Sequence, residues 1–248
     1  MLAASLAEGT TVIYNAAKEP EIKDLQDFLN GMGAKISGAS TDVIYIEGVK
    51  TLGKVEHKVI PDRIVTGTYL AAAAITGGEI ELTNVEPNHI QAITSKLREI
   101  GCTLIEKENN IYLKAPKQLR SVDIVRTQPY PGFPTDMQAQ MMALLTIASG
   151  TSIITETVFE SRFKHAEELM RMGADITIEG RTAIVKGVNE LTGTAVHAKD
   201  LRGGAALIMA GLVAQGSTVV EGAKHIERGY EEIDKNLQLL GASIRKID

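Results

Sequence analysis

The pattern of hydrophobic and polar positions repeats along the chain with a period of about 70 residues. In each copy a glycine precedes a strand rich in β-branched residues, and these glycines are Gly9, Gly78, Gly150 and Gly216. An amphipathic helix follows, and a second glycine suited to a left-handed helix C-terminus ends it, at Gly33, Gly101, Gly173 and Gly241. Tight hairpins come next, at 35–48, 103–115 and 175–187. The pattern therefore predicts a strand, a helix and a hairpin in each copy.

A second helix precedes each opening glycine, and its apolar residues continue nearly all the way round. Residues 68–76, 140–149 and 205–214 have this composition, which is typical of helices enclosed by the rest of a fold. Three aspartates suited to the N-cap begin these helices: Asp62, Asp136 and Asp200. Further strands are predicted before them, at 54–61, 122–127 and 194–198. The complete repeat is thus a βαβαββ unit.

The first and last copies of the repeat are incomplete. Asp62 and Asp200 precede their opening glycines by 16 residues and Asp136 by 14, but only eight residues precede Gly9. After Gly241 the chain ends at residue 248, where the other copies turn and add one more strand. Because a shortened enclosed helix and an open sheet edge are both costly, we expect the chain to be part of a longer protein.

Composition and charge narrow the classes of function. With 44% hydrophobic and 23% charged residues, the chain is an ordinary globular protein. A formal net charge of -5 and the absence of tryptophan argue against a nucleic-acid partner. No apolar run approaches the roughly 20 residues of a membrane span, so no membrane association is expected.

The cysteine content indicates the redox compartment. Cys102 is the single cysteine, which rules out a disulfide framework and favours a cytoplasmic protein. In the repeat register it occupies the position of Ala34, Ala174 and Ala242, so we expect it to pack in the core.

Six segments resemble motifs of the enolpyruvyl transferase family: AAKEPEIKDL (16–25), PDRIVTGTYL (61–70), FPTDMQAQ (133–140), TETVFESRF (155–163), AKDLRGGAAL (198–207) and HIERGYE (225–231). The resemblance runs in order through the whole chain and covers about the C-terminal three-fifths of a family member. It is closer to the branch that uses UDP-N-acetylglucosamine than to the branch that uses shikimate 3-phosphate.

The resemblance implies an α/β fold in which repeated βαβαββ units form an inside-out barrel, with helices inside and sheets outside. It implies that residues 1–60 are the C-terminal remnant of the first enolpyruvyl transferase domain. Residues 61–248 are then the second domain, which lacks its final strand.

The activity implied by the resemblance is transfer of the enolpyruvyl group of phosphoenolpyruvate to the 3-hydroxyl of UDP-N-acetylglucosamine, with release of phosphate. This is the first committed step of peptidoglycan synthesis. The expected partners are these two small molecules and the N-terminal region of the same protein, which carries the family's catalytic cysteine. No metal and no organic cofactor are expected, and this chain alone should show negligible turnover. Two alternatives remain: transfer to shikimate 3-phosphate, and a non-catalytic anion-binding or scaffolding module.

Asp136 is the leading candidate for acid–base chemistry. From the sequence alone it is an N-cap, as are Asp62 and Asp200 in neighbouring units. The resemblance implies that the Asp136 carboxylate contacts the sugar hydroxyl and takes its proton. Asp62 and Asp200 are weaker candidates for substrate binding.

Arginines are the second group of candidates, because guanidinium groups bind carboxylates and phosphates in two-pronged fashion. Arg162 and Arg228 each follow their opening glycine by 12 residues, which predicts equivalent loops. Arg202 lies in the first turn of its predicted helix, where a cation opposes the helix dipole unless an anion is nearby. A single arginine is ordinarily a solvated side chain, but three at such positions predict an anion site. The resemblance implies that all three bind substrate and that Arg202 and Arg228 are catalytic.

Four further features carry weaker predictions. The resemblance implies that the backbone of Val158 contacts the UDP-sugar, and Glu19 lies in the matching loop of the first copy. The histidines have no metal-site spacing, although His165 and His225 share loops with the arginines. The pair Gly203-Gly204 lacks the Lys-Ser/Thr ending of a phosphate loop.

Overall fold

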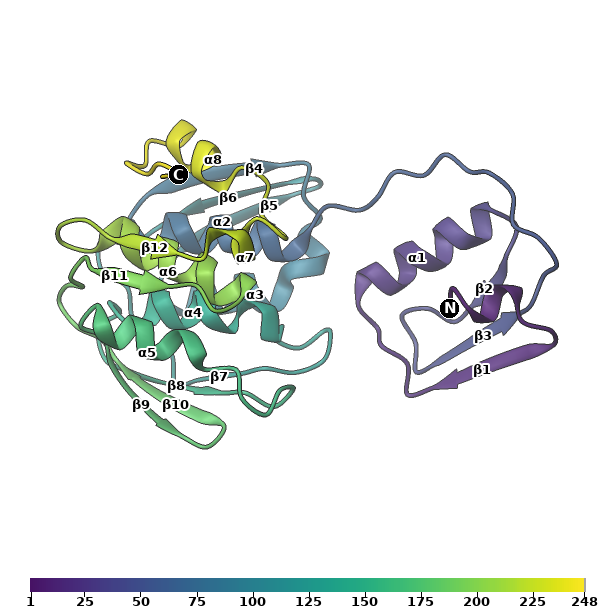
Figure 1. The fold of residues 1–248 in the computed structure, drawn as a ribbon, viewed down its shortest axis with the longest axis horizontal. Coiled ribbons are helices and arrows are strands. Elements are labelled where there is room, and N and C mark those ends of the chain that lie inside the picture. Colours follow the sequence, from purple (N-terminus) through teal and green to yellow (C-terminus); the bar gives the residue numbers. More distant parts are fainter. Residues whose placement is uncertain (248) are drawn as a thin grey trace. The chain divides into compact units, whose positions relative to one another are not determined.

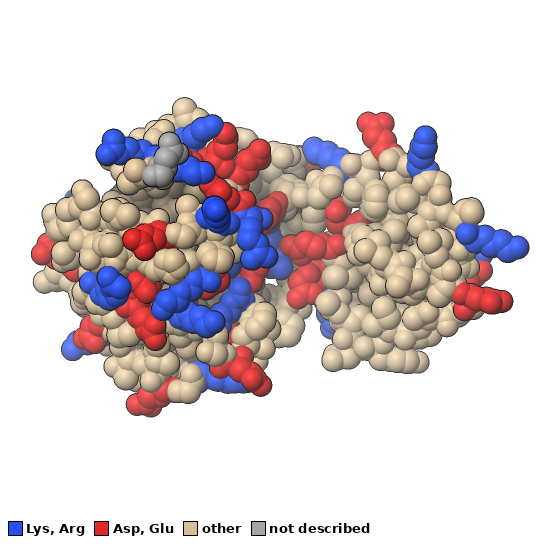
Figure 2. Space-filling model, viewed as in Figure 1, with Lys and Arg blue, Asp and Glu red and all other residues tan. Residues whose placement is uncertain are grey.

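The computed structural model describes residues 1–247 and divides into two compact units. The first unit contains residues 1–61 and 129–132, and the second contains the rest of the chain. On the visible face of each unit, Lys and Arg side chains are interspersed with Asp and Glu side chains (Figure 2). Within the described residues, every helix is too short or too polar to traverse a bilayer.

The first unit is a single strand–helix–hairpin copy of the repeat. Its elements are η1 (Ala4–Leu6), β1 (Thr10–Tyr14), α1 (Pro20–Gly31), β2 (Lys35–Ser37) and β3 (Val43–Glu47). The strands form an antiparallel sheet in the order β1-β3-β2, in which Thr10 pairs with Glu47 and Lys35 pairs with the same residue on the other side. Leu29 of α1 and Ile46 of β3 are fully buried in a small core between helix and sheet. The predicted hairpin at 35–48 is confirmed.

The strand predicted at 54–61 is wrong, because this segment forms neither helix nor strand. His57 Nε2 lies 2.9 Å from Asp24 Oδ1, and the His57 ring meets the Phe28 ring edge-on at 5.5 Å. The His57 side chain is therefore held by α1. A strand is stabilised by hydrogen bonds to the backbone of a neighbouring strand. This segment instead contacts side chains on the surface of α1.

The second unit has three enclosed helices: α2 (Arg63–Ile75), α4 (Gln138–Leu145) and α6 (Leu201–Val213). Every residue of α4 is buried, and the three helices contact one another at the centre of the unit (Figure 1). Because their surfaces are apolar nearly all round, each helix has to be covered on all sides. The prediction that these helices lie inside the fold is confirmed.

Strands surround the enclosed helices (Figure 1). The sheet orders are β4-β6-β5, β7-β8-β10-β9 and β11-β12. Their strands are β4 (Glu79–Thr83), β5 (Thr103–Lys107), β6 (Asn110–Lys114), β7 (Ile124–Arg126), β8 (Thr151–Thr155), β9 (Asp175–Glu179), β10 (Thr182–Lys186), β11 (Ala195–His197) and β12 (Val219–Glu221). The hairpins are antiparallel, whereas β7 pairs with β8 and β11 with β12 in parallel. Helices inside and sheets outside are the predicted inside-out α/β architecture.

The remaining helices of the second unit are η2 (Pro87–Ile90), α3 (Gln91–Glu99), η3 (Thr135–Met137), α5 (Lys164–Arg171), α7 (Ala223–Ile226) and α8 (Ile233–Leu239). The glycines that follow α3, α5 and α8 have φ values between +94° and +111°. Because other residues rarely adopt this conformation, the predicted glycine C-termini are confirmed.

Two small-residue predictions also concern the core of the second unit. Cys102 is 5% exposed within this core, and burial raises the pKa of its thiol to about 11, so the prediction of core packing is confirmed. A Cβ placed on Gly204 would lie 2.5 Å from Cγ1 of Ile226, so this glycine lets α6 approach α7 closely. The pair Gly203-Gly204 therefore serves helix packing.

Candidate functional site

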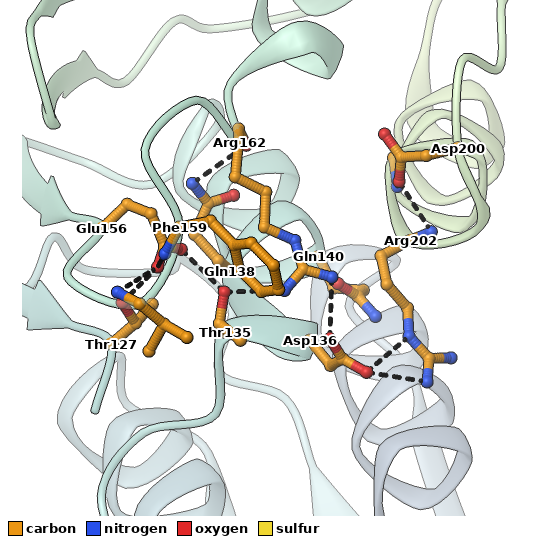
Figure 3. A network of polar contacts seen from close by, with 12 residues as sticks. Thr127, Thr135, Asp136, Gln138, Gln140, Glu156, Phe159, Arg162, Asp200 and Arg202 are labelled. Atoms are coloured by element: carbon orange, nitrogen blue, oxygen red, sulfur yellow. Dashed lines mark hydrogen bonds and ion pairs between the residues drawn. The ribbon is translucent and has the colours of Figure 1, made fainter. Parts of the chain in front are cut away.

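Asp136 joins two arginines that are distant in sequence (Figure 3). It lies in the short helix η3, which leads into the enclosed helix α4. Arg162 Nη2 donates to Asp136 Oδ1 at 2.7 Å. Arg202 Nη2 and Nε donate to Asp136 Oδ2 at 3.1 Å and 3.3 Å. We call Arg162 and Arg202 the arginine pair.

The predicted N-cap role is confirmed for Asp62 and Asp200 and is wrong for Asp136. Asp62 Oδ1 accepts from the amides of Ile64 and Val65, and Asp200 Oδ1 accepts from those of Arg202 and Gly203. Asp136 makes no capping hydrogen bond, and Pro134 occupies the N-cap position of η3.

The repeat spacing contains the signal for this difference. Pro134 precedes Gly150 by 16 residues, as Asp62 and Asp200 precede their own glycines. Asp136 lies two residues further on, out of register with the caps. Charge-assisted hydrogen bonds from guanidinium groups are stronger than those from neutral amides, which explains why its carboxylate pairs with arginine.

Arg162 is held on three sides. Besides Asp136, its guanidinium donates from Nη1 to Oγ1 of Thr135 at 2.7 Å. It also lies over the ring of Phe159, 4.7 Å from the centroid. Phe159 is 50% exposed, so this cation–π contact borders solvent. These contacts leave the guanidinium with a defined orientation at the surface of the second unit.

Arg202 is the more buried member of the arginine pair, with a side chain 12% exposed. It lies one turn or less from the N-terminus of α6, where the helix dipole disfavours a cation. The Asp136 carboxylate offsets this cost, and the guanidinium lies 5.4 Å from the centroid of the Tyr230 ring. Its Nη1 is buried and makes no hydrogen bond within residues 1–247. The predicted nearby anion is thus a side chain of the protein, and one donor remains free.

The electrostatics of the group favour the charged forms of Asp136 and Arg202. Burial alone would raise the pKa of the Asp136 carboxyl, but the hydrogen bonds and charges of Arg162 and Arg202 outweigh it and hold that pKa below its ordinary value. Burial alone would lower the pKa of Arg202, and Tyr230 and Asp136 outweigh it, so this pKa is raised. While both arginines contact it, Asp136 is a weak base.

Other predicted residues lie outside this ion-paired group. Arg228 is exposed in the loop between α7 and α8 and makes no hydrogen bond or ion pair within residues 1–247. The adjacent Gly229 lies against Arg202, because a Cβ there would be 3.7 Å from its Nη1. Arg162 and Arg228 are at equivalent positions of the sequence repeat, but only Arg162 binds Asp136.

Val158 and Glu19 also lie outside the ion-paired group. The amide of Val158 donates to Glu156 Oε1 at 2.8 Å, so the backbone atom of Val158 open to a ligand is its carbonyl. Glu19 occupies the N-cap position of α1 in the first unit and makes no capping hydrogen bond with its side chain.

Among residues that were not predicted from the sequence, Thr135, Phe159 and Tyr230 contact the arginine pair directly, and Glu156 contacts it through Thr135. Glu156 is 1% exposed. Buried and exposed residues alternate along β8, and the buried positions Ser152 and Ile154 are followed at the same spacing by Glu156. This alternation is the sequence signal that could have identified Glu156. A carboxylate on the buried face of a strand needs polar partners, and this pattern is readable from sequence.

Within residues 1–247, no three His, Cys, Asp or Glu side chains are grouped so that they could hold a metal ion. His165 on α5 is fully buried, and burial lowers its pKa to about 4. Its Nε2 makes no hydrogen bond, so His165 is a neutral side chain of the interior.

Comparison with known proteins shows which family has this arrangement. The chain is 58% identical over 247 residues to UDP-N-acetylglucosamine 1-carboxyvinyltransferase 2 of Caldanaerobacter subterraneus subsp. tengcongensis, and the match covers 100% of this chain and 59% of the relative. It is 59% identical to UDP-N-acetylglucosamine 1-carboxyvinyltransferase 1 of Symbiobacterium thermophilum, covering 100% of this chain and 56% of that relative. The chain therefore spans somewhat more than half the length of these relatives.

Solved structures have the same fold. The enolpyruvyl transferase NikO from Streptomyces tendae superposes with a TM-score of 0.87 at 26% identity, over 98% of this chain and 58% of that one. EPSP synthase from Acinetobacter baumannii superposes with a TM-score of 0.76 at 19% identity, over 98% of this chain and 59% of that one, and shows the fold alone.

A family model described as EPSP synthase (3-phosphoshikimate 1-carboxyvinyltransferase) matches residues 1–237. The match takes in the first unit, the second unit as far as residue 237, all three enclosed helices, and Asp136 with the arginine pair. The chain therefore belongs to the EPSP synthase family of enolpyruvyl transferases.

Proposed function

We propose that this chain forms part of an enzyme that transfers the enolpyruvyl group of phosphoenolpyruvate to the 3-hydroxyl of UDP-N-acetylglucosamine and releases phosphate. This reaction is the first committed step of peptidoglycan synthesis, and the proposal places it in the cytoplasm. The observation that carries the proposal is the arginine pair, which binds one carboxylate through three N–H donors.

Phosphoenolpyruvate brings the two anionic groups that such arginines bind, a carboxylate and a phosphate. In this proposal Arg162 and Arg202 bind the substrate anion, and the free Nη1 of Arg202 supplies a further donor. Arg228 is the third cation and, having no partner among the described residues, can turn toward the substrate.

Asp136 acts as the base in this reaction. When a substrate anion neutralises the arginine pair, the cause of the lowered Asp136 pKa is weakened and the carboxylate becomes a stronger base. It then takes the proton of the sugar hydroxyl while the hydroxyl oxygen bonds to C2 of phosphoenolpyruvate, the C2=C3 double bond opens, and C3 takes up a proton from an acid in the part of the protein that this chain does not cover. The tetrahedral ketal formed by this addition then loses phosphate from C2 and a proton from C3, which restores the double bond in the product.

The remaining candidates bind the UDP-sugar in the proposal. Val158 does so through its carbonyl, because its amide is occupied by Glu156. Asp62 and Asp200 are weaker candidates, since their carboxylates already cap α2 and α6. Glu19 belongs to the first unit and is also a weaker candidate.

The relatives support UDP-N-acetylglucosamine as the acceptor. The proteins named for UDP-N-acetylglucosamine are 54% to 59% identical to this chain, whereas the EPSP synthase structures are 19% identical. Shikimate 3-phosphate, the acceptor in the name of the family model, is the alternative of the same class. A non-catalytic anion-binding or scaffolding module is the alternative of a different class.

Measurement of phosphate release tests the proposal. The chain would be assayed alone and joined to the part of the Caldanaerobacter relative that it does not cover, because it spans 59% of that protein. We expect negligible turnover alone, turnover of phosphoenolpyruvate with UDP-N-acetylglucosamine in the joined protein, and loss of that turnover on Arg228→Ala.

Two outcomes would contradict the proposal. Turnover with shikimate 3-phosphate in place of the UDP-sugar would transfer the assignment to the other acceptor. If the joined and folded protein with Asp136 intact consumes neither acceptor, the scaffolding alternative is correct.

A further inference from the structure

Glu156 is a buried carboxylate whose oxygens are both hydrogen-bonded (Figure 3). Its Oε1 accepts from the Thr127 hydroxyl at 2.8 Å and from the amides of Val158 and Phe159 at 2.8 Å and 3.1 Å. Its Oε2 accepts from the Thr135 hydroxyl at 2.8 Å. A buried carboxyl group is costly without such partners, and four donors supply them here.

The four donors come from the two loops that carry Asp136 and Arg162. Thr127 follows β7 and Thr135 adjoins Asp136, so both lie on the segment that enters η3. The two amides lie in the loop between β8 and Arg162. Glu156 thus holds together the loops whose side chains form the Asp136–Arg162 ion pair.

The hydroxyl of Thr135 connects Glu156 to the arginine pair. It donates to Glu156 Oε2 and accepts from Arg162 Nη1 at 2.7 Å, so the buried side chain of Glu156 is one hydroxyl away from the guanidinium. Thr127 has the same pattern with a different donor: its hydroxyl donates to Glu156 Oε1 and accepts from the amide of Thr157 at 2.8 Å. The two threonines are therefore a matched pair, and only Thr135 contacts Arg162.

We propose that Glu156 is a positioning residue for Arg162, acting through the Thr135 hydroxyl. The inference rests on the proposed function, in which a substrate anion replaces Asp136 on the arginine pair. Arg162 then keeps two contacts, Thr135 and the Phe159 ring, and only the hydrogen bond to Thr135 fixes the direction of its donors. Glu156 polarises that hydroxyl and fixes its acceptor lone pair toward Arg162.

The positioning itself is tested without any substrate, by ¹⁵N NMR of the Arg162 side chain. Asp136→Asn removes the competing carboxylate, and Arg162→Lys assigns the resonance. We expect the guanidinium to remain ordered in Asp136→Asn and to rotate freely when Thr135→Val is added. Adding Thr127→Val should leave it ordered, although that change removes an equivalent hydrogen bond from Glu156. Thr135→Ser, which keeps the hydroxyl, should behave like the parent.

Thermal unfolding identifies variants that fail to fold, and Thr135→Ser keeps the test usable if Thr135→Val is unstable. The inference is overturned if Thr135→Val and Thr127→Val change the mobility of Arg162 equally, or if neither changes it. It is also overturned if Thr135→Ser frees the guanidinium as Thr135→Val does.

Calorimetric titration with phosphoenolpyruvate then separates this inference from the proposed function. We expect Thr135→Val to weaken binding about tenfold, the size of a lost hydrogen bond to a charged group, and Thr127→Val to change it less than twofold. Equal losses in both variants overturn the inference while the proposed function stands. If the parent chain binds no phosphoenolpyruvate, either alone or joined to the rest of the relative, the proposed function is wrong. The NMR result then decides independently whether Glu156 positions Arg162.

Discussion

The guanidinium of Arg202 lies 5.4 Å from the centre of the Tyr230 ring, and the hydroxyl of that tyrosine is anchored between two other helices. It is 2.8 Å from Oγ1 of Thr68 on α2 and 3.1 Å from Nε2 of Gln140 on α4. Tyr230 is 2% exposed. Residues from α2, α4 and α6 therefore meet at one buried side chain, which connects the orientation of Arg202 to the packing of the enclosed helices.

Tyr230→Phe tests this connection. It keeps the ring beneath Arg202 and removes the hydroxyl, leaving Thr68 and Gln140 without that partner. We expect the free energy of unfolding in urea to fall by about 1 kcal/mol, the net contribution of a hydrogen bond, because Thr68 and Gln140 keep the hydrogen bond that joins them. Phosphoenolpyruvate binding should weaken several-fold because the ring is less firmly held.

Tyr45→Phe is the control, because Tyr45 is 51% exposed and should change neither quantity. A Tyr230→Phe variant with the stability and affinity of the parent would show that the hydroxyl does not hold the ring.

Asp136→Asn should increase the affinity of the chain for inorganic phosphate. The carboxylate occupies Nη2 of both arginines, and it competes with any anion for the same donors. An amide lacks the negative charge, so we expect phosphate to bind several-fold more tightly, as measured by calorimetry at low salt.

Asp200→Asn is the matched control, because its carboxylate caps α6 and asparagine is an equally good N-cap. Phosphate affinity should stay at the parent value there. A decrease in affinity in Asp136→Asn would show that Asp136 supports anion binding and does not compete with it.

The buried His165 side chain should make the free energy of unfolding depend on pH. Its pKa is about 4 in the folded chain and 6.5 ordinarily, because burial disfavours the charged imidazole and the nearby Arg162 adds to this effect against the opposing Asp200. Between these values the unfolded chain binds a proton that the folded chain does not. Stability should therefore fall as the pH drops from about 6.5 to about 4, by roughly 3 kcal/mol.

Urea unfolding at several pH values between 7.5 and 4.5 measures this loss. His165→Gln cannot take up the proton and should flatten the dependence. The same substitution at His197, whose side chain is 52% exposed, should leave the pH dependence of stability unchanged. Parallel curves for the parent and His165→Gln would rule out His165 as the group responsible.

Cys102 should be unreactive in the folded chain. Burial raises the pKa of its thiol to about 11, so at pH 8 only about one molecule in a thousand carries the reactive thiolate. We expect iodoacetamide, followed by mass spectrometry, to label Cys102 slowly in buffer and completely in urea. Cys102→Ala should fold normally, since alanine stands at the equivalent positions of the other copies. Rapid labelling of the native chain would contradict the core assignment.

The repeat pattern was sufficient to predict most of the fold. Strands, outer helices, enclosed helices and the glycines that end helices all depend on periodicity within a few residues, which is a local property. The strand at 54–61 was mispredicted for the same reason. Its composition suits a strand, but its surroundings decide its conformation, and there His57 pairs with Asp24 on α1.

The candidate site was predictable only in part. Residue type and repeat position were enough to select Arg162 and Arg202, because anion binding needs guanidinium groups and Arg202 opposes a helix dipole. Asp136 was selected through the family resemblance, since the repeat pattern predicted it as a third cap beside Asp62 and Asp200. Sequence alone could not show that Arg162 pairs with Asp136 while the equivalent Arg228 remains exposed.

By itself, the sequence determined the repeat, the enclosed helices, the core position of Cys102 and the set of charged candidates. The tertiary structure decided which of them meet, because the decisive contacts join residues far apart: 66 residues separate Asp136 from Arg202, and 162 separate Thr68 from Tyr230. Helical and strand periodicity report which face of an element is buried, but not which side chain lies opposite it. That depends on how the elements pack: α2 and α4 hold Tyr230 beside Arg202, and the loops after β7 and β8 hold Glu156 one hydroxyl away from Arg162.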